Sequence, residues 1–163
     1  MLKEKFEELQ IRLLSEIKSY YKKRLVSVVI FGSVARGTFG FDSDLDILII
    51  AKRLPRGRMR RAKEFEIVEK KLDPFLKSLS DAGINTFLSV VFKTPAEAQK
   101  GSPLFLDMVE DARILFDQEG FFANILETLR GKLKKLGAKR VWKANSWYWI
   151  LNPNLKPGEI IEL

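Results

Sequence analysis

The sequence contains no cysteine and no histidine. Without cysteine, disulfides, thiolate zinc sites and cysteine nucleophiles are excluded, and without histidine the commonest general base and metal ligand is missing. Any metal ion must therefore be held by oxygen atoms. No stretch is long and apolar enough to span a bilayer, and residues 1–5 lack the apolar run of a signal peptide. These absences predict a cytoplasmic protein without membrane contact.

The size and composition indicate a single folded core. The chain has 163 residues, of which 46% are hydrophobic and twelve are phenylalanine, and this is enough apolar surface for one well-packed core. The length argues for one domain with at most an appendage. Lysine and arginine outnumber aspartate and glutamate by 29 to 21, which gives a formal net charge of +8 at pH 7.

The most informative segment begins with residues 25–31, a β-branched apolar run that predicts a strand covered on both faces. The run ends on Gly32, which permits a sharp turn and the close approach of a ligand. Ser33 can cap a short helix and donate its hydroxyl to a phosphate. The free amides of that helix would face an anion, and Arg36 would add a charge-assisted contact. Gly37 predicts a left-handed end to the helix.

Two aspartates follow on the next predicted strand, which is expected to begin at Asp44. Asp44 and Asp46 are two residues apart, so their side chains leave the same face of the strand. Two carboxylates this close repel each other unless a divalent ion neutralises them, and Mg²⁺ binds one or two carboxylates together with water and phosphate oxygens. Such a site suits phosphoryl or nucleotidyl transfer. Asp42 precedes the strand and is expected to close the turn through Ser43.

The segment from Gly32 to Asp46 resembles the DNA polymerase β-like nucleotidyltransferase superfamily, whose signature is glycine-serine followed by an aspartate-any-aspartate pair on the next strand. It looks most like the minimal nucleotidyltransferases of archaea and bacteria. The resemblance implies an α/β (α+β) fold, a palm with a mixed β-sheet flanked by helices. The specific motifs cover about residues 25–51, and the order of elements fits the palm as far as about Asp117.

The resemblance also implies a role for each motif residue. Asp44 and Asp46 would hold Mg²⁺, Gly32 and Ser33 would cradle the triphosphate of ATP or another NTP, and Arg36 matches an arginine common in the minimal members. Acceptors in the superfamily include proteins, antibiotics and nucleic acids, and minimal members often work with a small helical partner of the HEPN class. The prediction is therefore Mg²⁺-dependent transfer of a nucleotide, AMP from ATP first of all, to an acceptor hydroxyl.

One part of the family pattern is missing. Active members usually bring a third carboxylate from a later strand, where it completes the metal site and can activate the acceptor hydroxyl. The candidate strand, residues 84–92, contains no acid, although Asn85 or Ser89 could coordinate through a neutral oxygen. The more distant acids are Glu97, Asp107, Glu110 and Asp111. Two alternatives stay open: a non-catalytic nucleotide-binding or regulatory module, and an RNA-binding protein with a vestigial transferase site.

Hydrophobic periodicity predicts the helices that pack on the sheet. Residues 3–23 and 58–79 repeat apolar side chains at helical spacing, with Pro74 expected to bend the second helix. Residues 94–97 form a capping box that opens a short helix, and residues 113–116 predict another strand. The inward positions are Phe6, Leu9, Leu13, Ile17 and Tyr20 in the first helix and Phe65, Val68, Leu72 and Leu76 in the second.

The last third of the chain is less familiar. Residues 118–163 are predicted to form a helix and an aromatic hairpin that pack, as an extension, on the palm domain of residues 1–117. Gly137 closes the helix, and Asn145 is expected near the turn of the hairpin.

Two tryptophans of the predicted hairpin allow two interpretations. Trp147 and Trp149 share one strand face. They either stack nucleic-acid bases beside the nearby basic residues or pack on the preceding helix, which is the more frequent role of aromatic side chains.

A basic run lies between the second predicted strand and the second long helix. Residues 52–63 contain seven cations and no acid, and cations at the start of a helix oppose its dipole. An anionic partner would relieve that cost, whether a triphosphate, RNA or an acidic protein surface. A flexible, solvated loop explains the run equally well.

Overall fold

The computed structural model describes residues 1–143, 146–161 and 163. The helices are α1 (Leu2–Tyr21), α2 (Gly32–Arg36), α3 (Arg58–Asp81), α4 (Pro95–Lys100) and α5 (Phe121–Leu136), with short 3-10 turns η1 (Lys22–Arg24), η2 (Pro103–Asp107) and η3 (Gln118–Gly120). The strands are β1 (Leu25–Phe31), β2 (Leu45–Ala51), β3 (Leu88–Lys93), β4 (Arg113–Asp117), β5 (Lys139–Lys143) and β6 (Ser146–Ile150). In the part of the chain so described, no helix has the length and apolar character needed to cross a membrane.

Four strands form one mixed sheet in the order β3-β2-β1-β4. β1 runs antiparallel to both β2 and β4, whereas β2 and β3 run parallel. All seven residues of β1 are buried, as the unbroken apolar run predicts for a strand covered on both faces. The mixed sheet flanked by helices agrees with the predicted fold class.

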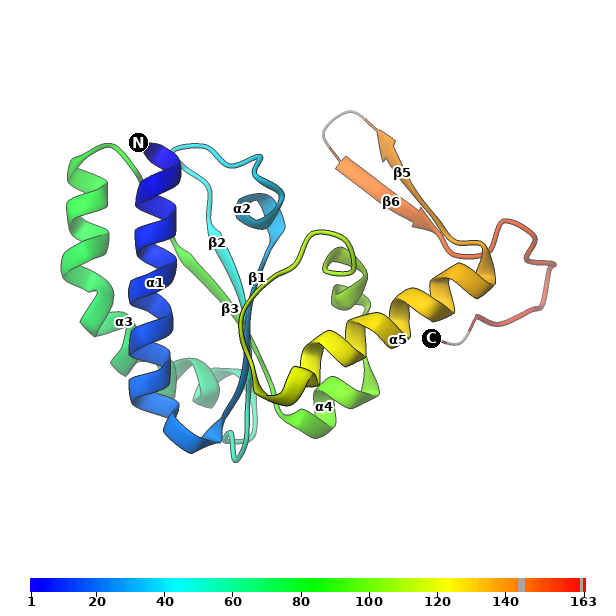
Figure 1. Cartoon of the computed structure of the whole chain (residues 1–163), viewed down its shortest axis with the longest axis horizontal. Coiled ribbons are helices and arrows are strands. Elements are labelled where there is room, and N and C mark those ends of the chain that lie inside the picture. Colours follow the sequence, from blue (N-terminus) through cyan, green and yellow to red (C-terminus); the bar gives the residue numbers. More distant parts are fainter. Residues whose placement is uncertain (144–145, 162) are drawn as a thin grey trace.

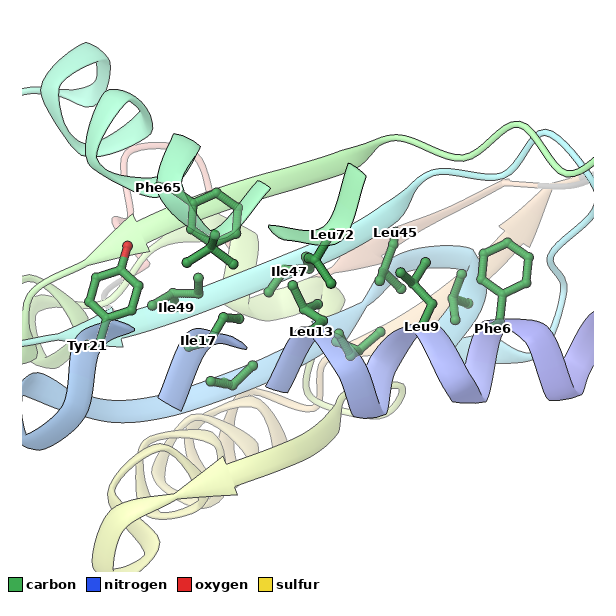
Figure 2. Packing of buried hydrophobic residues seen from close by; sticks show 14 of the residues in the cluster. Phe6, Leu9, Leu13, Ile17, Tyr21, Leu45, Ile47, Ile49, Phe65 and Leu72 are labelled. Carbon is green, nitrogen blue, oxygen red and sulfur yellow. The ribbon is translucent and has the colours of Figure 1, made fainter. Parts of the chain in front are cut away.

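The two long helices α1 and α3 lie side by side on one face of the sheet (Figure 1). Their apolar stripes meet alternate residues of β2, namely Leu45, Ile47 and Ile49, in one buried cluster (Figure 2). Alternation along a strand sends these three side chains to the same face. The sheet is therefore anchored on this side by a continuous apolar layer.

The opposite face of the sheet carries α4, η2 and α5 (Figure 1). Leu48 and Ile50 of β2 point to this side and pack in a second cluster with Phe105, Phe122 and Leu126. Asp46 shares the parity of Leu48 and Ile50, so its side chain leaves the sheet on the same face. The ends of β1 and β2 that carry the sequence motifs thus open toward η2 and the C-terminal part of the chain.

Three boundaries differ from the sequence-based prediction. α1 ends at Tyr21, and Tyr21 rather than Tyr20 is fully buried. β3 begins at Leu88 rather than at residue 84 because the preceding residues make isolated backbone hydrogen bonds, Asn85 N–H to Phe41 and Leu45 N–H to Phe87, in place of a regular ladder. β2 begins at Leu45, one residue later than expected.

The hairpin predicted after α5 is present as β5 and β6, which pair antiparallel. α5 ends at Gly137 in a left-handed conformation, as expected for a glycine after the last turn. The predicted turn residue Asn145 lies outside the described residues. The hairpin projects from the end of α5 on the same side of the molecule as α2 (Figure 1).

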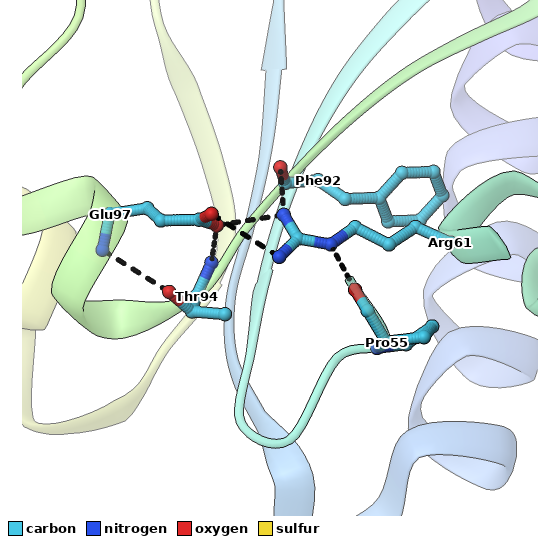
Figure 3. Close-up of polar contacts among 5 residues, drawn as sticks. All are labelled: Pro55, Arg61, Phe92, Thr94 and Glu97. Carbon is cyan, nitrogen blue, oxygen red and sulfur yellow. Dashed lines mark hydrogen bonds and ion pairs between the residues drawn. The ribbon is translucent and has the colours of Figure 1, made fainter. Parts of the chain in front are cut away.

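Arg61 of α3 joins three segments at the other end of the sheet (Figure 3). Its Nε donates to the carbonyl of Pro55 at 2.7 Å, and its guanidinium contacts both carboxylate oxygens of Glu97, at 2.7 and 3.2 Å. Glu97 also accepts the Thr94 N–H and thereby completes the predicted capping box of α4. One arginine thus fixes the 52–57 loop to the end of β3 and to α4.

This ion pair predicts a pH-dependent contribution to stability. The Arg61 guanidinium lowers the pKa of Glu97 from 4.5 to about 2. Because the folded-state pKa is depressed, the stabilisation is present above pH 4.5 and is lost as the pH falls toward 2. We expect Glu97→Gln to lower the unfolding free energy by about 1 kcal/mol at pH 7, a value kept small by solvent screening because the carboxylate side chain is 41% exposed.

Urea unfolding of both proteins at pH 7, 5 and 3 measures the effect. The control is Glu8→Gln, which removes an equally exposed carboxylate from the pair with Arg12 and should change stability by less than about 0.5 kcal/mol. A Glu97→Gln difference that is the same at pH 3 and at pH 7 would contradict the assignment.

Candidate active site

The turn from β1 into α2 brings the backbone against the neighbouring strand. Gly32 has φ +74°, and a Cβ at this position would lie 2.1 Å from Oδ2 and 3.0 Å from Cγ of Asp46. The sheet imposes this approach because Phe31 pairs with Asp46 in the β1–β2 register. Only glycine fits here, since rotating the carboxylate would still leave a Cβ to Cβ contact of 3.3 Å.

α2 is a single short turn of helix that ends as predicted at Gly37, where φ is +77°. Its N-cap is Phe31, and no side chain caps it. The prediction that Ser33 caps this helix is therefore wrong, because Ser33 lies inside the first turn, one residue past the start. Its hydroxyl is consequently not used as a cap, and the first amides of the turn have no partners within the helix.

The five residues predicted for the site line one pocket of about 420 Å³: Gly32, Ser33, Arg36, Asp44 and Asp46. Phe31, Asp107 and Trp147 complete its wall. Three of these motif residues belong to α2, which directly follows β1, whereas Asp44 directly precedes β2 and Asp46 lies on it. The antiparallel pairing of β1 with β2 brings these segments together. The sequence motif is thus one concave surface.

The electrostatics of the pocket favour a cation beside the aspartates. Burial raises the pKa of Asp46 above its usual value, and the charge of Asp44 raises it further, whereas the Ser89 hydroxyl and the Arg36 guanidinium lower it. A partly buried carboxylate next to a second one is a costly arrangement that a divalent cation relieves. Oxygen ligands of this kind fit Mg²⁺.

Comparison with known proteins agrees with this geometry. The family model described as "Nucleotidyltransferase domain" matches residues 11–115, more than half of the chain. The chain belongs to this family. The match spans β1, the Gly32 turn and the aspartates of this nucleotidyltransferase domain, and it confirms the resemblance seen in the sequence.

Individual proteins are also similar to this nucleotidyltransferase domain. A Methanocaldococcus jannaschii protein named "Putative protein adenylyltransferase MJ1305" is 29% identical over 134 residues, which cover 82% of this chain and 87% of the relative. Among solved structures, a chain from a toxin-antitoxin crystal structure with AMP-PNP has 15% identity and a TM-score of 0.45, covering 77% of this chain and 90% of that chain. A variant of the toxin-antitoxin MntA-HpeT gives 18% identity, a TM-score of 0.46, and coverage of 80% and 91%.

The structure separates the four distant acids. Asp107, at the end of η2, lines the pocket, and burial raises its pKa while Arg36 lowers it. Glu110 and Asp111 instead pair with Arg140, and Glu97 pairs with Arg61. No three acidic side chains within residues 1–143, 146–161 and 163 are close enough to hold one metal ion together.

The neutral candidates of the third predicted strand also differ in their placement. Ser89 lies beside Asp46 in the parallel register of β2 and β3, at the position where a third carboxylate could approach the pair. Asn85 is exposed, accepts a hydrogen bond from Ser80 and lies outside the pocket lining. Asp42 is exposed as well, and Ser43 closes the turn before β2 by accepting the Gly40 N–H at 2.7 Å.

The two tryptophans of β6 have different surroundings. Trp149 packs against the apolar cluster that contains Leu126 and Leu133 of α5, as the core interpretation predicts. Trp147 instead reaches the pocket and stacks on Arg36, with 4.3 Å between the guanidinium carbon and the ring centroid. The sequence did not show this contact, because the two residues are far apart in the chain.

The basic run of residues 52–63 lies at the opposite end of β2 from Asp46. β2 has seven residues, and at about 3.3 Å per residue the two ends are roughly 20 Å apart. A triphosphate bound at Gly32 is therefore out of reach of this run. Arg56 and Arg58 of this run line a separate groove of about 500 Å³, together with Lys93 of β3.

The close approach at Gly32 predicts a site-specific loss of stability. Gly32→Ala should destabilise the fold by about 2–4 kcal/mol, because it combines positive-φ strain with an overpacked contact against Asp46. Gly37→Ala is the matched control, since φ is also positive there but no atom lies within 4 Å of the added Cβ. It should cost only about 1–2 kcal/mol. Chemical unfolding of both variants measures the difference, and equal losses would contradict the contact.

Proposed function

We propose that this protein transfers AMP from ATP to a hydroxyl group of an acceptor protein in a Mg²⁺-dependent reaction. The observation that carries the proposal is the single pocket in which the Gly32 turn meets the two aspartates. Nucleotidyl transfer needs a phosphate cradle and a metal site in contact with each other. The name of the Methanocaldococcus jannaschii relative supports AMP as the transferred group and protein as the acceptor class.

Each pocket residue has a role in this proposal. Gly32 and Ser33 bind the triphosphate through backbone N–H groups and the serine hydroxyl. Arg36 compensates the negative charge that develops as pyrophosphate leaves. Asp44 and Asp46 hold Mg²⁺, which when bound supplies charge stabilisation to the phosphate oxygens.

Asp107 is the candidate general base. It is the acid outside the motif that lines the pocket, and burial raises its pKa, which strengthens it as a base. In the proposed reaction Asp107 takes the proton of the acceptor hydroxyl, the oxygen bonds to the α-phosphorus, and the bond from that phosphorus to pyrophosphate breaks. The third carboxylate thus comes from η2 in this proposal, whereas the family resemblance implies one from a later strand.

The second candidate is a nucleotide-binding module without turnover. It is favoured by Ser89, which occupies the position beside Asp46 and carries no charge. The two candidates share the nucleotide site and differ in whether Asp107 acts on an acceptor.

The remaining expectations stay predictions. They are a HEPN-type helical partner, an RNA or another anionic partner at residues 52–63, and a cytoplasmic location. The groove lined by Arg56, Arg58 and Lys93 gives an anionic partner a surface separate from the nucleotide pocket.

Nucleotide binding is tested by thermal unfolding with each NTP, with Mg²⁺ or with chelator. ATP at a hundred times its Kd should stabilise the fold by about 2.7 kcal/mol, or about 5–10 °C in Tm. The shift should require Mg²⁺ and should vanish in Asp44→Asn/Asp46→Asn. Removing the charge of the partly buried Asp46 and that of the exposed Asp44 beside it should leave the ligand-free variant at least as stable as the wild type, so loss of the shift is not loss of the fold. No shift with any NTP would overturn the proposal.

A second variant separates binding from transfer. Asp107→Asn should keep the Mg²⁺-dependent shift with ATP while lowering the rate of AMP transfer about 10²- to 10⁴-fold, the usual contribution of a general base. Asp42→Asn, at an exposed carboxylate outside the pocket, is the control and should leave both unchanged. Labelling from α-³²P-ATP measures transfer. Unimpaired labelling by the Asp107 variant would exclude it as the base.

A further inference from the structure

The wall of the nucleotide pocket includes a residue from beyond the family match. That match ends at residue 115, yet Trp147 of β6 lines the pocket together with Arg36 and Asp107. A side chain from the C-terminal hairpin therefore contributes to a site whose motif residues all lie between residues 32 and 46.

The contact of Trp147 is with a motif residue. The guanidinium carbon of Arg36 lies 4.3 Å from the centre of the indole ring, well within the range of a cation–π interaction. Nη1 of Arg36 is buried and has no hydrogen-bond partner among the described residues. The indole face is thus one restraint on the direction of this guanidinium, beside the charges of Asp46 and Asp107.

The hairpin that carries Trp147 is itself fixed. Arg140 of β5 pairs with Asp111 at 2.5 Å and with Glu110 at 3.2 Å, and its own side chain is only 12% exposed. Its guanidinium carbon lies 5.4 Å from the Trp147 ring centre. On the same strand as Trp147, Trp149 packs into the apolar cluster of α5. These contacts tie both strands of the hairpin to the body of the protein.

The same contacts argue against a base-stacking role for Trp147. Guanidinium groups of Arg36 and Arg140 both lie over its ring. A nucleobase would compete for the indole with these two groups and with Trp142, whose ring centre lies 5.3 Å away. Holding Arg36, in contrast, needs no rearrangement.

We propose that Trp147 is a positioning residue that holds Arg36 in the orientation required to bind the β- and γ-phosphates of the nucleotide. This inference rests on the proposed function of the pocket. A free arginine side chain samples many rotamers, and ordering it costs free energy at the moment of binding. The indole contact removes part of that cost in advance, so the C-terminal hairpin sets the affinity for the triphosphate.

The test compares two substitutions that both keep an apolar side chain. Trp147→Phe retains an aromatic face, and Trp147→Leu keeps apolar bulk without one. Trp147→Leu should weaken Mg²⁺-ATP binding about 3- to 30-fold, the range of one cation–π contact, and Trp147→Phe should recover most of the loss. AMP lacks the β- and γ-phosphates, so its affinity should change less than about two-fold. Isothermal titration calorimetry measures both ligands.

The control is Tyr148→Ala, which removes an aromatic side chain that is 51% exposed on the other face of β6 and should leave both affinities unchanged. A double-mutant cycle with Arg36→Ala adds the decisive comparison. Once Arg36 is absent, Trp147→Leu should cause no further loss of ATP affinity. Additive losses, or equal weakening of ATP and AMP, would overturn the positioning role.

A measurement without nucleotide keeps this inference separate from the proposed function. Relaxation of the Arg36 side-chain ¹⁵Nε should show restricted motion in the wild type and in Trp147→Phe, and fast motion in Trp147→Leu. Equal mobility in all three proteins would overturn the inference whether or not ATP binds. Restricted motion without ATP binding to the wild type would refute the proposed function and leave only the Trp147–Arg36 contact.

Discussion

The site depends on the distance between the backbone of Gly32 and the carboxylate of Asp46. The pairing of β1 with β2 sets this distance, and both strands are held in place by apolar layers on the two faces of the sheet. Because neither strand can shift without exposing buried side chains, the short turn of α2 stays against Asp46. The backbone position of Arg36 and the shape of the pocket floor follow from this fixed start of α2.

The core on both faces supports an arrangement of charges that is unfavourable by itself. Asp46 and Asp107 are both partly buried, and burial raises the pKa of each, while Arg36 lowers both. The Arg36 guanidinium thus partly compensates two carboxylates that come from different elements, and Arg140 also lowers the pKa of Asp107. Partly buried carboxylates with raised pKa values are typical of functional sites, where a bound ligand completes the charge balance.

Local sequence predicted the part of the site that lies on adjacent elements. Gly32, Ser33, Arg36, Asp44 and Asp46 fall within fifteen residues, and one turn between two paired strands brings them together. The same holds for the mixed sheet and for the capping box of α4, whose signals are periodicity and spacing. Asp107 and Trp147 were not predicted as pocket residues because only tertiary packing brings them there. For the same reason the start of β3 was wrong, since partners across the chain decide where a ladder becomes regular.

The origin of the pocket wall separates two functions within one site. Asp46 lies on β2, and Gly32 and Asp44 lie directly next to the paired strands β1 and β2. In the proposed function these residues provide a phosphate cradle and a cation site. Asp107 and Trp147 come from η2 and the hairpin, which are elements outside the sheet and can vary without disturbing it. The residues proposed to act on the acceptor, or to hold Arg36 for the triphosphate, therefore lie where sequence change costs the fold least. In the proposed function the sheet fixes the position of the reaction site, and elements outside the sheet determine its selectivity.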